Sequence, residues 1–190
     1  MEHVPIKIVR GAVDAHVHLR QPAGLVDVVS AGIAAVRDAG TKGGAGLRRS
    51  GPGGPRVISA GWALVRKGGY GSFMGVAVEG RAEVRAEVLK LKAAGAGIIK
   101  VVASGMVSLK EPGKITSGGF SREELLTIVE EAAAAGLGVM AHANGDDAIT
   151  NSARAGVRSI EHGFFMTREG LNLGRMRAMA RESGDGEAGP

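Results

Sequence analysis

The 190-residue sequence contains no cysteine, and aromatic side chains make up only 3% of it. Without cysteine the chain forms no disulfide and offers no thiolate to a metal ion. The scarcity of aromatic rings argues against the stacking platforms that bind single-stranded nucleic acids. No apolar run is long enough for a transmembrane helix, and the N-terminal stretch MEHVPIKIVRG lacks the apolar region of a signal peptide. We therefore expect a cytoplasmic protein that binds neither membranes nor nucleic acid.

The net charge of +5 does not change this expectation, because the basic residues are scattered and their densest group lies in a glycine-rich loop over residues 41–55. The content of 44% hydrophobic and 23% charged residues is typical of a globular protein. The 32 glycines favour many tight turns, and the core residues available are mainly Ala, Val, Ile and Leu. This composition favours layered α/β packing.

Short apolar segments alternate with amphipathic segments along the chain, and this alternation predicts a parallel sheet, either doubly wound or a barrel. The expected strands span residues 9–18, 33–37, 56–59, 98–102, 139–141 and 159–161. The expected helices span residues 80–95, 121–136 and 146–156, and Ser121 with Glu124 predicts a capping box. We assign residues 1–166 to one α/β domain and residues 167–190 to a short helix, near residues 171–180, followed by a disordered polar tail.

The segment VDAHVHL places His16 and His18 one residue apart in the first expected strand. Side chains two positions apart on a strand share a face, so the two imidazoles point the same way. Two neutral imidazoles on one face are poor core residues but form half of a metal site.

Three more candidate ligands occur in later strands: Lys100 within an apolar segment, and His142 and His162 at strand ends. Taken singly, each histidine could be a hydrogen-bonded structural residue, and Lys100 could extend its ammonium group to solvent. Burial of a lysine is costly unless the charge is neutralised, and carboxylation by carbon dioxide would convert it into an anionic bidentate ligand. Because active sites of parallel α/β folds lie at the C-terminal ends of strands, the joint placement predicts a divalent metal site.

Other polar residues have weaker assignments. Glu161 precedes a candidate ligand and either orients an imidazole or forms a structural salt bridge on the opposite face. Arg37 and Asp38 are expected to pair with each other or to cap a turn. Four residues after strand ends are expected to line the substrate pocket: Tyr70, Ser104, Met106 and Asn144.

The segments VDAHVHL, GIAAVRDAG, GPRVISAGWAL, GIIKVVASG, FSREELLTIVEEAAAAGLGVMAHANG and AGVRSIEHG resemble successive motifs of the amidohydrolase superfamily, in its imidazolonepropionase-like and Xaa-Pro dipeptidase-like branch. The resemblance implies a TIM-barrel-like fold with one or two divalent metals, usually zinc. It implies that His16 and His18 bind one metal, that His142 and His162 bind the other, and that carboxylated Lys100 bridges them. A metal-activated hydroxide would then attack a C–N bond of a small cyclic amide or dipeptide.

The sequence departs from this family pattern in several places. The family's metal-binding aspartate of the eighth strand has no counterpart after His162, since Asp185 lies in the polar tail. Tyr70 stands in GGYG where relatives often have a histidine, the first crossover is short, and no segment is left for the flanking β-sandwich. The resemblance therefore implies a barrel truncated after about the sixth strand.

Three alternatives stay open at this point. The chain could be a catalytically impaired metal-binding remnant, or a partial barrel completed by a second copy in a homo-oligomer, because an open parallel sheet leaves unpaired edges. An organophosphate or lactone hydrolase would use the same metal centre. A basic nucleic-acid-binding module would require the clustered charge that this sequence lacks.

Overall fold

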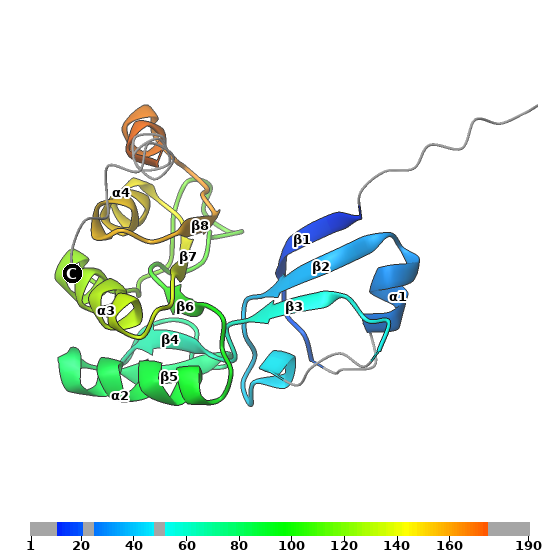
Figure 1. Cartoon of the computed structure of the whole chain (residues 1–190). Coiled ribbons are helices and arrows are strands. Elements are labelled where there is room, and N and C mark those ends of the chain that lie inside the picture. Colours follow the sequence, from blue (N-terminus) through cyan, green and yellow to red (C-terminus); the bar gives the residue numbers. More distant parts are fainter. Residues whose placement is uncertain (1–10, 21–24, 48–51, 175–190) are drawn as a thin grey trace, which may run out of the picture.

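The computed structural model describes residues 11–20, 25–47 and 52–174, and it contains two parallel sheets. The first sheet has the order β1 (Ala12–Val17), β2 (Ile33–Asp38), β3 (Arg56–Ser59). The second has the order β5 (Gly75–Val78), β4 (Ala63–Arg66), β6 (Ile99–Val102), β7 (Val139–Ala143), β8 (Ser159–His162). Every strand pair in both sheets is parallel (Figure 1).

The two sheets are consecutive parts of one strand series. Only residues 60–62 separate β3, which pairs with β2, from β4, which pairs with β6. The backbone N–H of Gly97, shortly before β6, donates to the carbonyl oxygen of Ser59 in β3 at 2.9 Å. β3 and β4 therefore share one position in the series β1, β2, β3/β4, β6, β7, β8, and β5 adds to the outer edge of β4. Within the described ranges these six positions form an open, barrel-like curve that does not close.

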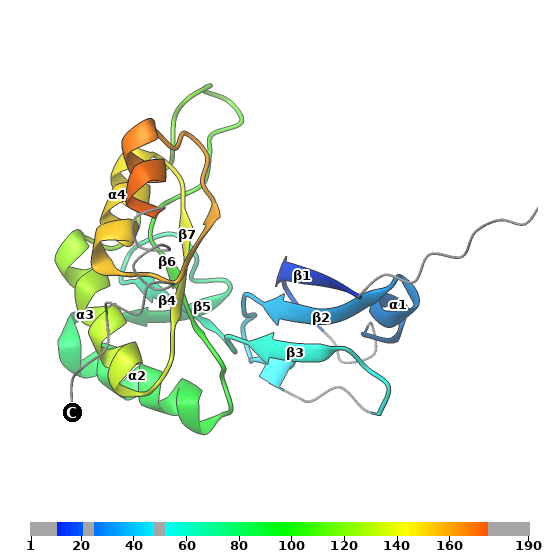
Figure 2. The same ribbon diagram turned by 45° about the horizontal axis from the view of Figure 1, so that its top comes forward.

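Four α-helices connect the strands: α1 (Leu25–Ser30), α2 (Gly80–Ala93), α3 (Arg122–Ala134) and α4 (Asp146–Ala155). Figures 1 and 2 show α2, α3 and α4 on one side of the five-stranded sheet, whereas α1 packs beside β2. A 3₁₀ turn (Ala45–Leu47) lies beneath β3. The predicted capping box is present at α3, where Ser121 accepts from the Glu124 N–H and the Glu124 side chain accepts from the Ser121 N–H.

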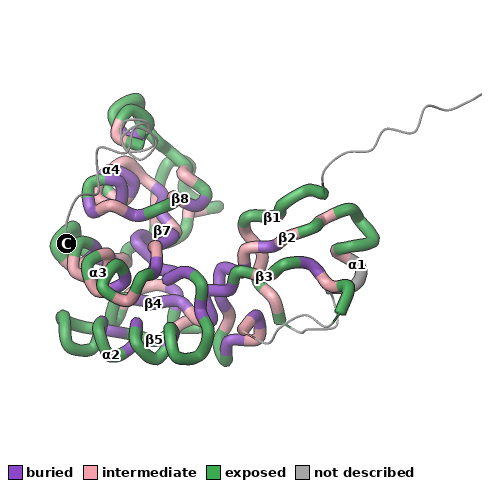
Figure 3. The backbone as a smooth tube through the Cα atoms, in the orientation of Figure 1, coloured by how far each residue is buried: buried purple, intermediate pink, exposed green. Residues whose placement is uncertain are grey.

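The alternation of side chains along the strands separates a hydrophobic face, which packs in the core, from a face that carries candidate metal ligands. In β6, Ile99 and Val101 belong to the main core, so Lys100 between them points to the opposite face. The main core fills the space between these strands and the helices; its fully buried side chains include Leu64, Val88, Leu91, Ile99, Val101, Leu125, Ile128 and Ile149. Figure 3 shows the buried residues concentrated around β4, β6 and β7, while β1 is mostly exposed.

The structure has a strand at each of the six expected places. It also has two strands that the sequence analysis missed, β4 and β5, because each is only four residues long and lies between glycines that favour turns. Helix α1 was also missed, within the short first crossover. The three expected helices correspond to α2, α3 and α4.

The assignment of residues 167–190 to a separate segment stays a prediction. Residues 168–174 are helical, which starts the expected helix three residues early, and residues 175–190 lie outside the described part of the chain. Arg154 of α4 forms an ion pair with Glu169 at 2.8 Å, which holds this helix against α4. In the ranges that the structure covers, no helix has the length and apolar character needed to cross a membrane.

The close pairing of β4 with β5 depends on Gly75. A Cβ atom at this position would lie 2.1 Å from the carbonyl oxygen of Ala63, whereas one at Gly174 would meet no atom within 4 Å. We expect Gly75→Ala to lower the free energy of unfolding by about 1–3 kcal/mol, the usual cost of overpacking. The control Gly174→Ala, on a helix, should change it by less than about 1 kcal/mol. Urea unfolding followed by circular dichroism measures both, and equal stability of the two variants would contradict the pairing.

Candidate metal centre

The five candidate metal ligands line one cavity of about 220 Å³. It opens at the C-terminal ends of β1, β6, β7 and β8, where parallel α/β folds place their active sites. Its lining residues are His16, His18, Tyr70, Met74, Lys100, Val102, Met106, His142 and His162. Residues separated by up to 146 positions in the sequence therefore come together in one pocket.

The four imidazole rings follow one another around this pocket. The ring centroids of His18 and His16 are 5.3 Å apart, those of His16 and His162 are 4.9 Å apart, and those of His162 and His142 are 4.7 Å apart. As these side chains stand, no group of three or more His, Asp or Glu side chains among the described residues is arranged to hold a metal ion. The structure therefore assembles the donors without closing them around one point.

Lys100 is one of the most buried side chains of the protein, with 2% of its surface exposed. Burial lowers its pKa to about 8, although the carboxylate of Glu161 acts in the opposite direction; the Arg37 charge lowers it further. No hydrogen bond or ion pair holds its ammonium group among the described residues. A buried amine with this pKa is present in its neutral, nucleophilic form at mildly alkaline pH.

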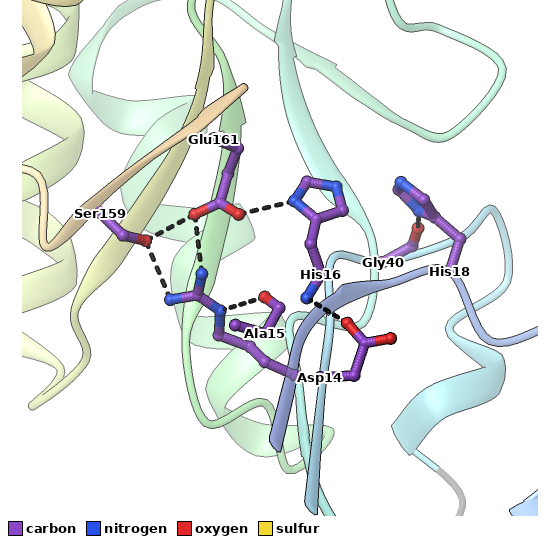
Figure 4. A network of polar contacts seen from close by, with 8 residues as sticks. Asp14, Ala15, His16, His18, Gly40, Ser159 and Glu161 are labelled. Carbon is purple, nitrogen blue, oxygen red and sulfur yellow. Dashed lines mark hydrogen bonds and ion pairs between the residues drawn. The ribbon is translucent and has the colours of Figure 1, made fainter. Parts of the chain in front are cut away.

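His16 and His18 are each held through Nδ1. The Nδ1 atom of His16 lies 2.6 Å from Oε2 of Glu161, and Nδ1 of His18 lies 2.6 Å from the carbonyl oxygen of Gly40 (Figure 4). An imidazole that donates its Nδ1–H to a carboxylate or carbonyl keeps a lone pair on Nε2, and this is the usual arrangement of metal-binding histidines. Both side chains of the first strand therefore fit a metal.

A β-bulge in β1 helps to aim His16. The register between β1 and β2 shifts between Asp14 and Val17, the segment that contains His16. Such a shift releases a backbone group from the ladder and re-aims a side chain. The N–H of His16 donates instead to Oδ1 of Asp14 at 3.1 Å, so Asp14 satisfies the backbone at the bulge.

His142 is held through its other ring nitrogen. Nε2 of His142 lies 3.1 Å from the carbonyl oxygen of Gly105 and 3.2 Å from Nδ2 of Asn144. Burial lowers the pKa of His142 below its ordinary value. Burial also lowers the pKa of His162 to about 4, and electrostatic interactions with His142, His16 and Lys100 lower it further, whereas the Glu161 carboxylate acts in the opposite direction. Both imidazoles are therefore neutral at pH 7, as a metal ligand requires.

The strand end at His162 explains why Glu161 and His162 lie on the same side of the sheet. Alternation predicts that these neighbours face opposite sides, but His162 has a backbone φ of +70°, a conformation that is rare for a residue with a side chain. The strand therefore ends with both side chains near His16: Glu161 bonds to its Nδ1, and the His162 ring contacts its ring. The sequence carries no signal for this strained residue.

Of the two expectations for Arg37 and Asp38, mutual pairing is wrong, whereas Asp38 does cap a turn, since its Oδ1 accepts from the N–H of Gly40 at 3.2 Å. Arg37 forms an ion pair with Glu161, Nη2 to Oε1 at 2.8 Å, and also donates to Ser159 and Ala15. Burial acts to raise the pKa of Glu161, but the hydrogen bonds from His16 and Ser159 and the charges of Arg37 and Lys100 outweigh it and lower the pKa to about 2. Glu161 is therefore an anion that orients an imidazole, as the first of its two readings supposed.

The expected pocket residues divide into two pairs. Tyr70 and Met106 line the cavity, and burial raises the pKa of Tyr70. Ser104 and Asn144 lie behind it: the Ser104 hydroxyl accepts from the Asn144 N–H at 2.9 Å, and the Asn144 amide lies 3.2 Å from Nε2 of His142. Met74 also lines the cavity and was missed, because it lies in the segment KGGYGSFMG between β4 and β5, to which the sequence analysis assigned no element.

The residues present fit a divalent metal. The donors are four imidazoles and a lysine that carboxylation would convert into an oxygen ligand, and nitrogen and oxygen donors of this kind suit zinc. Two of the imidazoles already have the acceptors on their second nitrogens that metal-binding histidines use.

Comparison with known proteins agrees with this arrangement. Ochratoxinase from Aspergillus niger is 35% identical over 141 residues, a match that covers 61% of this chain and 29% of the relative. A crystal structure of a prolidase complexed with N-methylphosphonate-L-proline is 28% identical, with a TM-score of 0.71. A crystal structure of a Xaa-Pro dipeptidase with bound methionine in the active site is 26% identical, with a TM-score of 0.75.

Each of these two structural matches covers 95% of this chain and 57% of the solved chain. The chain therefore spans less than a third of the curated relative and little more than half of the solved relatives. The model of the amidohydrolase family matches residues 8–184. Since this match includes nearly the whole sequence, the chain belongs to the amidohydrolase family.

Proposed function

We propose that this chain carries the metal-binding part of a hydrolase that cleaves a C–N bond of a small cyclic amide or dipeptide. The observation that carries the proposal is the convergence of four histidines and a buried lysine in one cavity. The names of the structural relatives, a prolidase and a Xaa-Pro dipeptidase, favour a dipeptide. The size of the cavity, about 220 Å³, also favours a small substrate.

In this proposal His16 and His18 hold one metal, His142 and His162 hold a second, and Lys100 lies between the two pairs. A bound divalent metal, with zinc as the expected ion, supplies a hydroxide at neutral pH and polarises the carbonyl group. The protein prepares the two pairs differently: Glu161 and Gly40 hold the rings of His16 and His18, and burial lowers the pKa of His142 and His162.

Lys100 becomes a ligand by reacting with carbon dioxide. Its neutral amine forms a bond to the carbon atom and releases one proton, and the product is an anionic carbamate. The reaction requires a neutral amine, which burial provides by lowering the pKa of Lys100 to about 8. The conversion also replaces a buried amine that has no hydrogen-bond partner among the described residues by an anion whose charge a bound metal would neutralise.

One group that hydrolysis needs is not among the lining residues. No aspartate or glutamate is among the described residues that line the cavity, so no lining carboxylate can take the proton from an attacking water. This observation favours a second candidate function, a metal-binding partial barrel that requires another polypeptide segment, such as a second copy, to complete it. The two candidates differ in hydrolysis and agree in metal binding.

Metal content distinguishes the proposal from a structural role of the histidines. The full chain, purified without chelator or histidine tag and dialysed against zinc, should hold up to about two metals per chain by elemental analysis. The double variant His16→Ala/His18→Ala should lose at least half of this metal, whereas His3→Ala, outside the expected ligand set, should lose none. Folded wild-type protein that binds no metal would contradict both candidate functions.

The same preparation is then assayed with Xaa-Pro dipeptides and small cyclic amides. Hydrolysis that is lost in His16→Ala/His18→Ala and retained in His3→Ala supports the amide hydrolase. Two bound metals without turnover of any substrate would contradict it and would favour the partial barrel.

The pKa of Lys100 predicts a pH dependence of carboxylation. With ¹³C-labelled bicarbonate, a carbamate carbon signal should appear in the wild type and increase from about pH 7 to about pH 9, because the neutral amine becomes the major form above pH 8. Lys100→Met should abolish the signal, and Lys114→Met, which removes an exposed lysine, should not. A signal of equal size in the Lys100→Met protein would contradict this assignment.

Stability provides a second test of the same lysine. In metal-free protein and carbonate-free buffer, the unfolded chain binds more protons than the folded one between pH 8 and 10.5, because folding lowers the pKa of Lys100 from 10.5 to about 8. The free energy of unfolding should therefore rise with pH across this window, by up to about 3 kcal/mol from this residue. Lys100→Met should remove that rise, and a rise that persists in the variant would show another origin.

A further inference from the structure

Two adjacent residues of β2, Arg37 and Asp38, reach His16 of β1 and His18, which directly follows β1, by separate routes. Because neighbouring residues on a strand point to opposite faces, Arg37 and Asp38 cannot serve the same side chain directly. We propose that Arg37 and Asp38 are positioning residues, Arg37 for His16 through Glu161 and Asp38 for His18 through Gly40. The proposal rests on the proposed function, in which these histidines bind a metal, and it adds the residues that fix them before the metal arrives.

The first route begins with the three groups that Arg37 binds at once. Its Nε donates to the carbonyl oxygen of Ala15 at 2.7 Å, its Nη1 to Ser159 Oγ at 2.9 Å, and its Nη2 to Glu161 Oε1 at 2.8 Å. Ala15 directly precedes His16 in β1, so the guanidinium group joins the backbone beside the histidine to β8. Only a planar group with several fixed donors makes three such bonds together.

Glu161 then transmits this position to the imidazole. Its Oε1 accepts from Arg37 and from the Ser159 hydroxyl at 2.7 Å, and this leaves Oε2 for Nδ1 of His16 at 2.6 Å (Figure 4). The Glu161 side chain is 6% exposed, so water does not compete strongly for these oxygens. With both carboxylate oxygens engaged, the His16 ring has one favoured tautomer, with the proton on Nδ1 and the lone pair on Nε2.

The second route uses Asp38, which is completely buried. Its Oδ1 accepts from the backbone N–H groups of Leu19 at 3.0 Å and Gly40 at 3.2 Å, and its Oδ2 accepts from Ser59 Oγ at 2.6 Å. Leu19 directly follows His18, and the carbonyl oxygen of Gly40 accepts from Nδ1 of His18. Asp38 therefore fixes both the backbone after His18 and the glycine that holds its ring.

The backbone at Gly40 and at Gly46 leaves little free space around the contacts of this second route. Gly40 has a φ of +88°, a conformation that favours glycine, and this turn aims its carbonyl group at His18. At Gly46 a Cβ atom would lie 2.0 Å from Oδ2 of Asp38 and 2.8 Å from Oγ of Ser59. The 3₁₀ turn that contains Gly46 thus packs directly on the Asp38 carboxylate, which has no space to move.

The test uses three single variants of the full chain: Arg37→Met, Asp38→Asn and, as a matched control, Arg81→Met. Arg81 also binds two carboxylates, those of Glu130 and Glu131, but it lies on α2, away from the cavity. Zinc affinity is measured by competition with a chromophoric chelator. The ¹⁵N chemical shifts of the imidazole rings, which report the tautomer, are measured in the metal-free proteins.

We expect Arg37→Met to weaken zinc binding by about 10-fold or more, the effect usual for groups that orient metal-binding histidines. In the metal-free protein the same variant should shift the ring signals of His16 toward a mixture of tautomers and leave those of His18 in place. Asp38→Asn should do the reverse, and Arg81→Met should change neither measurement. Unchanged zinc affinity and unchanged ring signals in Arg37→Met and Asp38→Asn would overturn the proposal.

The ring signals separate this proposal from the proposed function. If the wild type binds no zinc, the proposed function fails, and the positioning roles are decided by the metal-free spectra alone. If Arg37→Met does not fold, Arg37→Lys replaces it: lysine keeps the charge beside Glu161 but cannot bind three acceptors in one plane, so zinc affinity should fall while the fold is retained. Wild-type affinity and ring signals in a folded Arg37→Lys protein would overturn the role of Arg37.

Discussion

The carboxylate of Glu161 is the contact on which the arrangement of the pocket depends. It lies on β8, at one end of the strand series, and binds His16 of β1 and Arg37 of β2 at the other end. No strand pairing joins β8 to β1 among the described residues, so these polar bonds connect the two ends of the open curve. Removal of one partner from such a buried pair leaves an uncompensated charge, which is strongly destabilising. The same bonds therefore maintain the curvature of the fold and the position of a candidate ligand.

The burial of Lys100 costs folding free energy that packing alone does not explain. The protein buries an amine whose charged form is disfavoured, and it surrounds that amine with imidazoles that burial keeps neutral. Packing alone does not require such residues, since an apolar side chain of similar size would fill the same space at lower cost. The unfavourable burial, together with the backbone strain at His162, is typical of groups held for a chemical purpose.

The sequence predicts those parts of this site that depend on the two-residue alternation of side chains along a strand. Alternation on β1 places His16 and His18 on one face, and apolar segments that end in His142 or contain Lys100 identify strands whose ends meet. The partners of these residues could not be predicted, because they depend on two features without a sequence pattern. The left-handed backbone at His162 turns its own side chain toward the face that Glu161 shares with His142, and the open curve brings Arg37 within reach of Glu161. The division of the third strand position by residues 60–62, in a segment rich in glycine, was invisible for the same reason.

The open curve also explains why the candidate metal ligands share one cavity but do not surround a single point. Three of the five candidate ligands are fixed from different sides: His16 from β8, His18 from the turn after β2, and His142 from the loop after β6. These anchors set the orientation of each ring, whereas the distances between rings follow from the curvature of the strand series. Across the opening, the bonds of Glu161 and Arg37 and the contact between the His16 and His162 rings join β8 to β1 and β2. Orientation is therefore determined locally in this chain, and closure around a metal requires either the metal itself or further strands between β8 and β1.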